Sequence, residues 1–208
     1  MTPKQILQRL HRNNFRPSLE LAACAVLLLA LTAGSLLAWK HGWWPVTFGC
    51  WLLQAHIGHT ALLAFHQASH YTLHPNRWLN ELMGVVLGSV ILTPLSAYRW
   101  VHNQHHLHLG TLRDTELWPF VDPQTPRWKR RLAAAGELLF GFFYTPVIFL
   151  RGVLVARRMP RAKSRRLVHE YALAAALWTG VVIAVIRFGV MEEFAVGYQI
   201  PALLSGNL

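Results

Sequence analysis

Two histidine clusters, His66-Gln67-Ala68-Ser69-His70 and His102-Asn103-Gln104-His105-His106, stand out in this 208-residue chain. They read H-x-x-x-H and H-x-x-H-H, and the stretch 56–108 around them holds nine of the twelve histidines. On an α-helix, residues i and i+4 project from one face, about 40° apart, so His66 and His70 can bind one metal ion. His102 lies one turn before His105 and His106, which diverge by about 100° and can face different ions. The spacing therefore favours two metal ions that share five imidazoles.

The ligand type narrows the choice of metal. Imidazole suits zinc, copper, iron and nickel. Cys24 and Cys50 lie in apolar runs away from both clusters, which excludes a thiolate zinc site. They are interpreted as small buried hydrophobic residues and indicate no disulfide framework.

Three further histidines lie near the first cluster. His56 and His59 fall with His66 and His70 within an arc of roughly 80° if one helix carries all four. Either of the two can be a ligand or can bond to a neighbouring helix. His74 continues the i+4 spacing, but it precedes Pro75, where a helix is expected to end, so we interpret it as structural.

Composition indicates a membrane protein. Hydrophobic residues make up 53% of the chain and charged residues 14%, in long uncharged runs. The formal charge of +11 is compatible with nucleic-acid binding, but the basic residues cluster at the ends of apolar runs, as membrane orientation requires. We find no phosphate loop, zinc finger or nucleic-acid fold signature, and we expect no nucleic-acid partner.

The apolar runs predict one membrane domain over residues 1–208. After a polar, basic segment at 1–18, we expect spans at about 19–39, 45–65 and 171–190, with a further span starting at about 200. The first run has 21 residues, whereas the apolar region of a signal peptide has roughly 7–15, so we predict a retained span.

The shorter apolar runs predict helices that do not cross the membrane. Residues 82–95 are too few to span and contain Pro94, which indicates an interfacial or re-entrant helix. Residues 138–155, flanked by basic clusters on both sides, indicate an in-plane helix, and residues 113–131 indicate a polar segment without firm secondary structure. The predicted fold is an all-α integral membrane protein in which transmembrane and interfacial helices carry a histidine cluster on the cytoplasmic side.

The distribution of charge predicts the orientation. In this topology eighteen of the twenty Lys and Arg residues lie on the inner face, and the exceptions are Lys40 and Arg187. Residues 41–44 then face outside, while residues 72–80 and 157–166 face the cytoplasm. We expect an inner or plasma membrane protein with both clusters on the cytoplasmic side.

The two clusters and their surroundings resemble the first two histidine boxes of the membrane fatty acid desaturases. His74-Pro75-Asn76-Arg77 and Leu79-Asn80-Glu81, with Gly84, follow the first cluster (box one) as in bacterial members, and Leu109-Gly110-Thr111, with Asp114, follows the second (box two). The resemblance covers roughly residues 20–208. Such enzymes carry a third H-x-x-H-H box, which this chain lacks. The closing segment of this chain, residues 198–203, resembles the region of those enzymes that lies just upstream of their third box. We therefore expect an N-terminal portion that is inactive by itself.

The resemblance implies two non-haem iron ions, and it favours iron over zinc. The implied ligands are His66, His70, His102, His105 and His106, and the implied reaction uses O₂ to convert adjacent methylenes of an acyl chain into an alkene. An external ferredoxin- or cytochrome b5-like donor supplies two electrons, and the basic face can dock it. Asp114 and Glu116 can help to balance the charge, although we interpret Glu116 as a solvated loop charge.

Other activities remain as alternatives. Lipid hydroxylases and carotenoid ketolases carry similar boxes, and a non-catalytic histidine-rich metal-binding membrane protein is the alternative from another class. The sequence leaves open which bond is oxidised and whether phospholipid, CoA or a carrier protein holds the acyl group.

Overall fold

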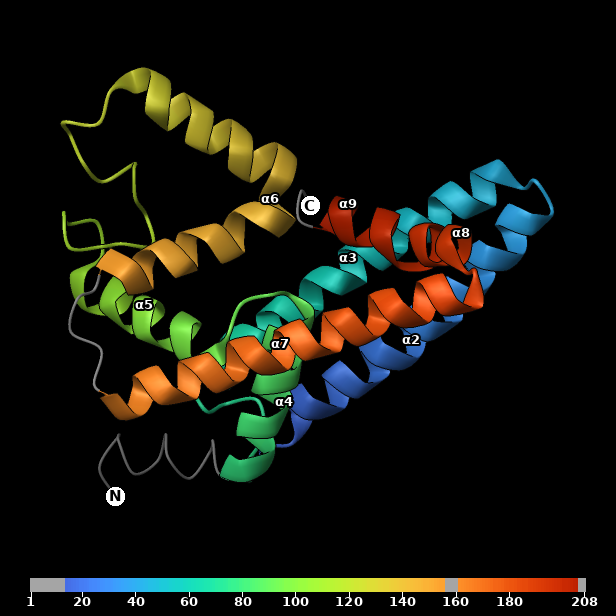
Figure 1. The fold of residues 1–208 in the computed structure, drawn as a ribbon, viewed down its shortest axis with the longest axis horizontal. Helices are drawn as coiled ribbons and strands as arrows, with labels where there is room; N and C mark the ends of the chain where they lie inside the picture. The colour runs from blue at the N-terminus through green and yellow to red at the C-terminus, as the bar shows by residue number, and fades with distance from the viewer. Residues whose placement is uncertain (1–13, 156–160, 206–208) are drawn as a thin grey trace. The chain divides into compact units, whose positions relative to one another are not determined.

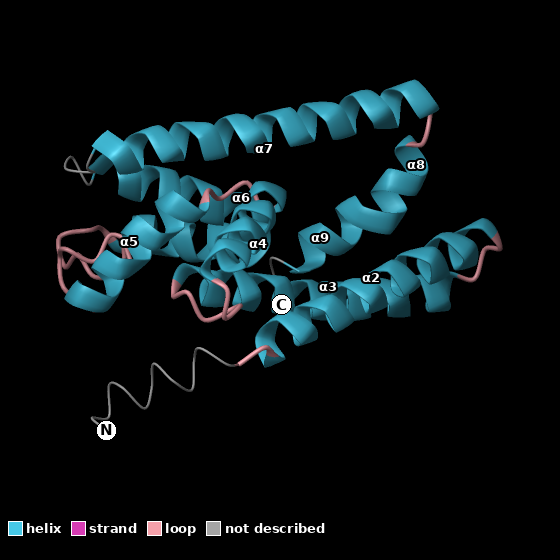
Figure 2. Cartoon of the chain, turned by 90° about the horizontal axis from the view of Figure 1, so that it is seen from below, coloured by secondary structure: helices cyan, strands magenta, loops and turns pink. Residues whose placement is uncertain are grey.

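The fold is all-helical over the residues that the computed structural model describes, 14–155 and 161–205, with no strand among them (Figures 1 and 2). Most of the predicted basic segment at 1–18, and part of the one at 157–166, lie outside the described residues. The described residues divide into two compact units, 14–87 with 184–205, and 88–155 with 161–183.

The first unit is built on an antiparallel pair of long helices, α2 (Arg16–Lys40) and α3 (Trp44–Ser69), which run side by side (Figure 1). The turn between them places Gly42 at φ 71°, a conformation that glycine adopts without steric cost. Small buried residues of α2, Ser35 and Ala38, allow the two helices to approach closely. The predicted span 19–39 therefore corresponds to α2, with the boundaries moved by a few residues.

A polar contact joins these two helices to the C-terminal segment, which consists of α8 (Met191–Phe194), the π-helix η1 (Ala195–Gln199) and α9 (Ile200–Ser205). The Gln54 amide on α3 donates to Thr32 Oγ1 at 2.9 Å and to the Gly197 carbonyl at 3.2 Å. A Cβ at Gly197 would lie 3.1 Å from Thr32 Cγ2, so only glycine fits this approach without a shift. Trp51 also donates to the Val196 carbonyl. These contacts hold the C-terminal segment to the α2–α3 pair.

A fully buried asparagine fixes the end of α3. The helix stops at Ser69, and Tyr71 takes φ 62°. Asn80, in α4 (Arg77–Val90), donates to the Ala68 carbonyl at 2.9 Å and accepts from the backbone N–H groups of Leu73 and His74. One side chain thus satisfies three backbone groups at the point where box one ends.

The second unit contains α5 (Leu95–His108), α6 (Arg127–Val155) and most of α7 (Arg161–Phe188). The Tyr98 ring on α5 lies 4.6 Å from the Phe149 ring on α6, and the Trp178 indole on α7 donates to the Ser89 carbonyl. The helix break expected near Pro94 is present, because α4 ends at Val90 and Pro94 is the N-cap residue of α5.

The start of α5 is capped by an acid from another helix. The N-cap residue itself, Pro94, has no side-chain acceptor for the first N–H groups of α5. Glu170 on α7 takes this role. Its carboxylate accepts from the Ser96 N–H and from the Ser96 hydroxyl, both at 2.8 Å. Arg166 also donates to Glu170 at 2.8 Å, and Glu170 is 5% exposed. The charge is therefore buried with partners on both sides.

Two helices begin earlier than the apolar pattern predicted. The prediction of no firm structure over 113–131 was wrong for its last part, because α6 begins at Arg127, after Pro126. The basic first turn opposes the helix dipole, but Arg130 donates to the Asp122 carbonyl and ties the turn to the preceding loop. Helix α6 is kinked at Phe140, near the predicted start at 138. Helix α7 begins at Arg161 rather than Tyr171. The prediction counted only the apolar run, whereas the polar residues before it are helical as well.

Within the described parts of the chain, two helices are long and apolar enough to cross a membrane, and the broken pair α4–α5 makes a third if it counts as one span. The two are α2 and residues 164–188 of α7. Their apolar side chains are exposed, with Leu29 at 72% and Ile186 at 67%, as expected for surfaces that face lipid. The protein is an all-α membrane protein. Helix α3 has 26 residues, enough to cross, and its crossing stays a prediction.

Replacement of Asn80 by Ala should destabilise the first unit. It removes the acceptor of the Leu73 and His74 N–H groups and one donor to the Ala68 carbonyl, so we expect a loss of about 2–4 kcal/mol. Asn76→Ala is the matched control, because exposed Asn76 caps α4 by accepting from Trp78 and Leu79, and loss of a cap costs about 1 kcal/mol. Unfolding in detergent micelles measures both. A smaller effect for Asn80→Ala than for Asn76→Ala would contradict the role given to Asn80.

Replacement of Glu170 by Ala should loosen the start of α5. The Ser96 N–H loses its acceptor, so amide hydrogen exchange over residues 95–100 should accelerate, with a stability loss of about 2–3 kcal/mol. Arg166→Ala is the comparison, because it removes the ion pair but leaves both bonds from Ser96 to Glu170 in place, so exchange over residues 95–100 should accelerate less than in Glu170→Ala. Unchanged exchange in Glu170→Ala would show that the carboxylate does not cap the helix.

Candidate functional site

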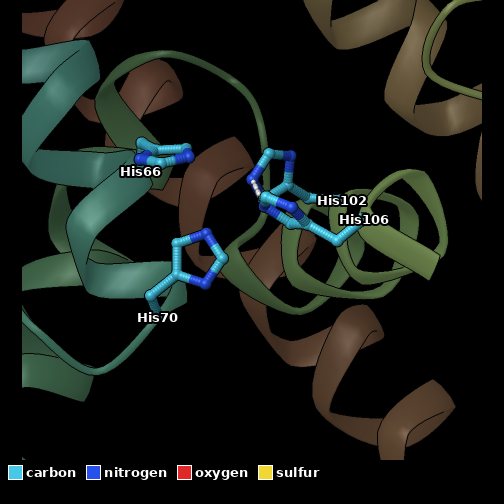
Figure 3. Close-up of side chains that lie close together, drawn as sticks. All are labelled: His66, His70, His102 and His106. Atoms are coloured by element: carbon cyan, nitrogen blue, oxygen red, sulfur yellow. Dashed lines mark hydrogen bonds between the residues drawn. The ribbon is translucent and has the colours of Figure 1, made fainter. Parts of the chain in front are cut away.

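Box one lies at the C-terminal end of α3. His66 is in the last turn, and His70 is the residue that directly follows the helix. The two rings lie 4.8 Å apart between centroids and are inclined at 68° (Figure 3). Both side chains are half-buried. The i+4 spacing therefore brings these two imidazoles together, as the sequence predicted.

Box two occupies the last two turns of α5. His102 is buried at 5% exposure, His105 is half-buried and His106 is exposed. The Nε2 atoms of His102 and His106 lie 3.0 Å apart, the contact drawn as a dashed line in Figure 3. The rings of His102 and His105 are stacked, with 5.7 Å between centroids. Helix α5 thus gathers the three predicted ligands of box two.

Each of two box-two histidines has a carboxylate at its Nδ1 atom. Glu116 Oε2 lies 2.9 Å from His102 Nδ1, and the two Asp114 oxygens lie 3.0 and 3.1 Å from His105 Nδ1. The Glu116 side chain is only 22% exposed. The interpretation of Glu116 as a solvated loop charge was therefore wrong, because the loop folds back and directs this carboxylate at box two.

Asp114 also organises the loop that follows α5. Its carboxylate accepts from the backbone N–H groups of Gly110, Glu116 and Leu117. Gly110 itself takes φ 71°, which favours glycine at this turn. Burial acts to raise the pKa of Asp114, but the hydrogen bonds from the His105 ring and from backbone amides outweigh it. They hold that pKa below its ordinary value.

Three other histidines of the stretch, which the sequence placed near box one, have different surroundings. His56 and His59 are exposed on α3, well before its C-terminal end. His74 accepts from the backbone N–H of Asn76 through Nδ1, and its ring meets the edge of Phe15 at 5.3 Å. The structural interpretation of His74 agrees with these contacts.

The donor set fits a metal such as iron. All five predicted ligands are imidazoles on helix ends, and imidazole is a ligand that iron accepts. A metal–nitrogen bond to imidazole is about 2.1 Å long in zinc sites. Two such bonds at a right angle place their nitrogen atoms about 3 Å apart. The 3.0 Å between His102 Nε2 and His106 Nε2 matches this spacing.

Three residues around box two escaped the sequence prediction of the site. Tyr98 stacks on His102 with 5.0 Å between ring centroids, and its i−4 position was a signal that could have revealed it. Glu116 follows the recognised Asp114 by two residues, but a loop gives no periodicity from which to infer its direction. Glu170 is 74 residues from Ser96, and the sequence carries no local signal that links them.

Comparison with known proteins agrees with this geometry. The family model described as fatty acid desaturase matches residues 41–206, which include both boxes, Asn80 and Glu170. The chain is 26% identical over 143 residues to an sn-1 oleoyl-lipid 12-desaturase of Anabaena variabilis, a match that covers 65% of this chain and 39% of that protein. It is 25% identical over 148 residues to the protein of the same name from Synechocystis sp., with coverage of 69% and 39%.

A third relative has the word ferredoxin in its name. The sn-1 acyl-lipid omega-3 desaturase (ferredoxin) of Nostoc sp. is 29% identical over 75 residues, which cover 36% of this chain and 21% of that protein. The matches thus span about two fifths or less of the length of these relatives. Because the family model matches most of the chain, including the two histidine boxes, this protein belongs to the fatty acid desaturase family.

Proposed function

We propose that the complete protein is a membrane-bound acyl-lipid desaturase that uses O₂ and iron to convert a saturated bond of an acyl chain into an alkene. The observation that carries the proposal is the family match over both histidine boxes, whose imidazoles lie on the ends of α3 and α5. The relatives named above carry the names oleoyl-lipid desaturase and acyl-lipid desaturase. These names favour desaturation over hydroxylation, ketolation or a purely structural role.

The proposed iron ligands are two imidazoles from α3 and three from α5. His66 and His70 come from the first helix, and His102, His105 and His106 from the second. Iron supplies the O₂-dependent removal of hydrogen from an acyl chain, for which amino-acid side chains have no equivalent. The chain's own contribution is to hold the ligands. Asn80 fixes the end of box one, and Glu170 fixes the start of the helix that carries box two.

The proposed substrate and donor follow from the setting and the relatives. The exposed apolar surfaces of α2 and α7 place the protein in lipid, so an acyl chain can reach it from the bilayer. We propose a ferredoxin-like protein as the source of two electrons, because one relative is named for ferredoxin. The strongly basic composition, with a formal charge of +11, would favour the approach of an acidic donor.

We propose that both boxes face the cytoplasm. The support is the positive-inside rule: in the predicted topology eighteen of the twenty Lys and Arg residues lie on the same face of the membrane as the boxes, while the α2–α3 turn carries few. At that other end, Trp39 donates to Glu192 and Lys40 pairs with Glu193 at 3.6 Å, so its charges are partly neutralised within the chain.

Loss of a proposed ligand should lower the iron content. For protein expressed from the complete gene and purified in detergent, His66→Ala and His106→Ala should each reduce iron affinity by more than about tenfold. His169→Ala is the control, because this exposed histidine of α7 belongs to neither box. Metal analysis after dialysis against a graded chelator measures the affinity. Equal iron in the three variants and the wild type would rule out the assignment.

Cysteine labelling tests the orientation. In a background without Cys24 and Cys50, a cysteine at exposed His41 should react with an impermeant thiol reagent in intact cells. A cysteine at exposed Arg165 should react only after the membrane is permeabilised. Reaction at position 165 in intact cells would overturn the proposed sidedness.

A further inference from the structure

We propose that Glu116 is a positioning residue for His102, and that Asp114 has the same role for His105. Each carboxylate holds its imidazole in the tautomer and orientation that present Nε2 to a metal ion. This inference rests on the proposed function, which assigns both histidines as ligands, and adds the residues that hold them.

The tautomer follows from the chemistry of the partners. An ionised carboxylate carries no hydrogen and only accepts, so the hydrogen of each contact must lie on the histidine Nδ1. The contacts are short, 2.9 Å for Glu116 to His102 and 3.0 Å for Asp114 to His105. A neutral imidazole with its hydrogen on Nδ1 has a free electron pair on Nε2. Both rings are thereby set to bind metal through Nε2.

The orientation follows from the packing. The Tyr98 ring stacks on the His102 ring with an interplanar angle of 24°. The His105 ring also stacks on the His102 ring, with an interplanar angle of 18°. His102 is 5% exposed and the Asp114 side chain is fully buried, so water competes little for these hydrogen bonds. The rings are therefore restrained both by stacking and by the hydrogen bond at Nδ1.

The negative charges of Asp114 and Glu116 can balance the positive charge of a metal ion whose proposed protein ligands are all neutral imidazoles. Five imidazoles bring no negative charge, whereas Asp114 and Glu116 bring up to two, one imidazole away from the metal. A carboxylate at the outer nitrogen makes the inner nitrogen more basic and strengthens its bond to the metal. The acids thus act through the histidines and not as ligands themselves.

Glu116 is the cleaner residue for a test. Asp114 also accepts from three backbone N–H groups, so its replacement would disturb the loop as well. By contrast, the hydrogen bonds recorded for the Glu116 carboxylate in the described chain both go to His102 Nδ1. Glu116→Ala removes the acceptor, while Glu116→Gln keeps an oxygen that accepts from Nδ1 and loses only the charge.

The experiment compares wild type, Glu116→Ala, Glu116→Gln and the control Glu137→Ala, which removes an exposed acid of α6. Each is expressed from the complete gene and loaded with ⁵⁷Fe in detergent, and iron affinity, the Mössbauer spectrum and thermal unfolding are measured. We expect Glu116→Ala to bind iron about 10–100-fold more weakly, with an altered quadrupole splitting. Glu116→Gln should recover most of the affinity, and Glu137→Ala should match wild type.

The outcomes separate the two proposals. Wild-type protein that binds no iron would refute the proposed function, and this inference with it. Wild-type protein that binds iron while Glu116→Ala shows the same affinity and spectrum would refute the positioning role alone. A Glu116→Gln variant as weak as Glu116→Ala would also refute it, because the hydrogen bond would then have no effect. Should Glu116→Ala fail to fold, Glu116→Gln decides, because loss of the charge should alter its quadrupole splitting while most of the affinity is kept, and an affinity and spectrum identical to wild type would refute the role of the carboxylate.

Discussion

Buried hydrogen bonds at the end of α3 and at the start of α5 are the constraint on which both boxes depend. A helix end leaves backbone groups without partners, and in apolar surroundings each unpaired group costs more than it would in water. Asn80 solves this problem after box one, and Glu170 solves it before box two. Because both side chains are buried, the helix ends are held in place, and the positions of the imidazoles follow from them.

Local sequence signals were sufficient for α2, for the neighbouring rings of His66 and His70, and for the break before α5. The uninterrupted apolar run after residue 18 predicted α2 because length and hydropathy are properties of the run itself. The i+4 spacing of His66 and His70 predicted neighbouring rings, and Pro94 predicted the break before α5. In each case the physical cause lies within a few residues of the feature that it determines.

The residues that escaped prediction owe their roles to distant partners. Pro94 marks the start of a helix, but the acceptor for that start comes from Glu170, on another helix. Glu116 looked like an ordinary loop acid because nothing in its neighbours shows that the loop turns back toward His102. The start of α6 was missed for a similar reason, since Arg130 stabilises it through the carbonyl of Asp122, which lies outside the helix. Tertiary contacts decide all three.

The buried ionisable groups concentrate around one helix. Among the buried polar side chains of the described residues, the ionisable ones are His102, Asp114 and Glu170. His102 belongs to α5, Asp114 bonds to a histidine of α5, and Glu170 caps it. Burying an ionisable group is unfavourable unless partners compensate, so such groups persist where a specific geometry must be kept. Since each contact lies within one unit, the geometry of box two is a local property of that unit.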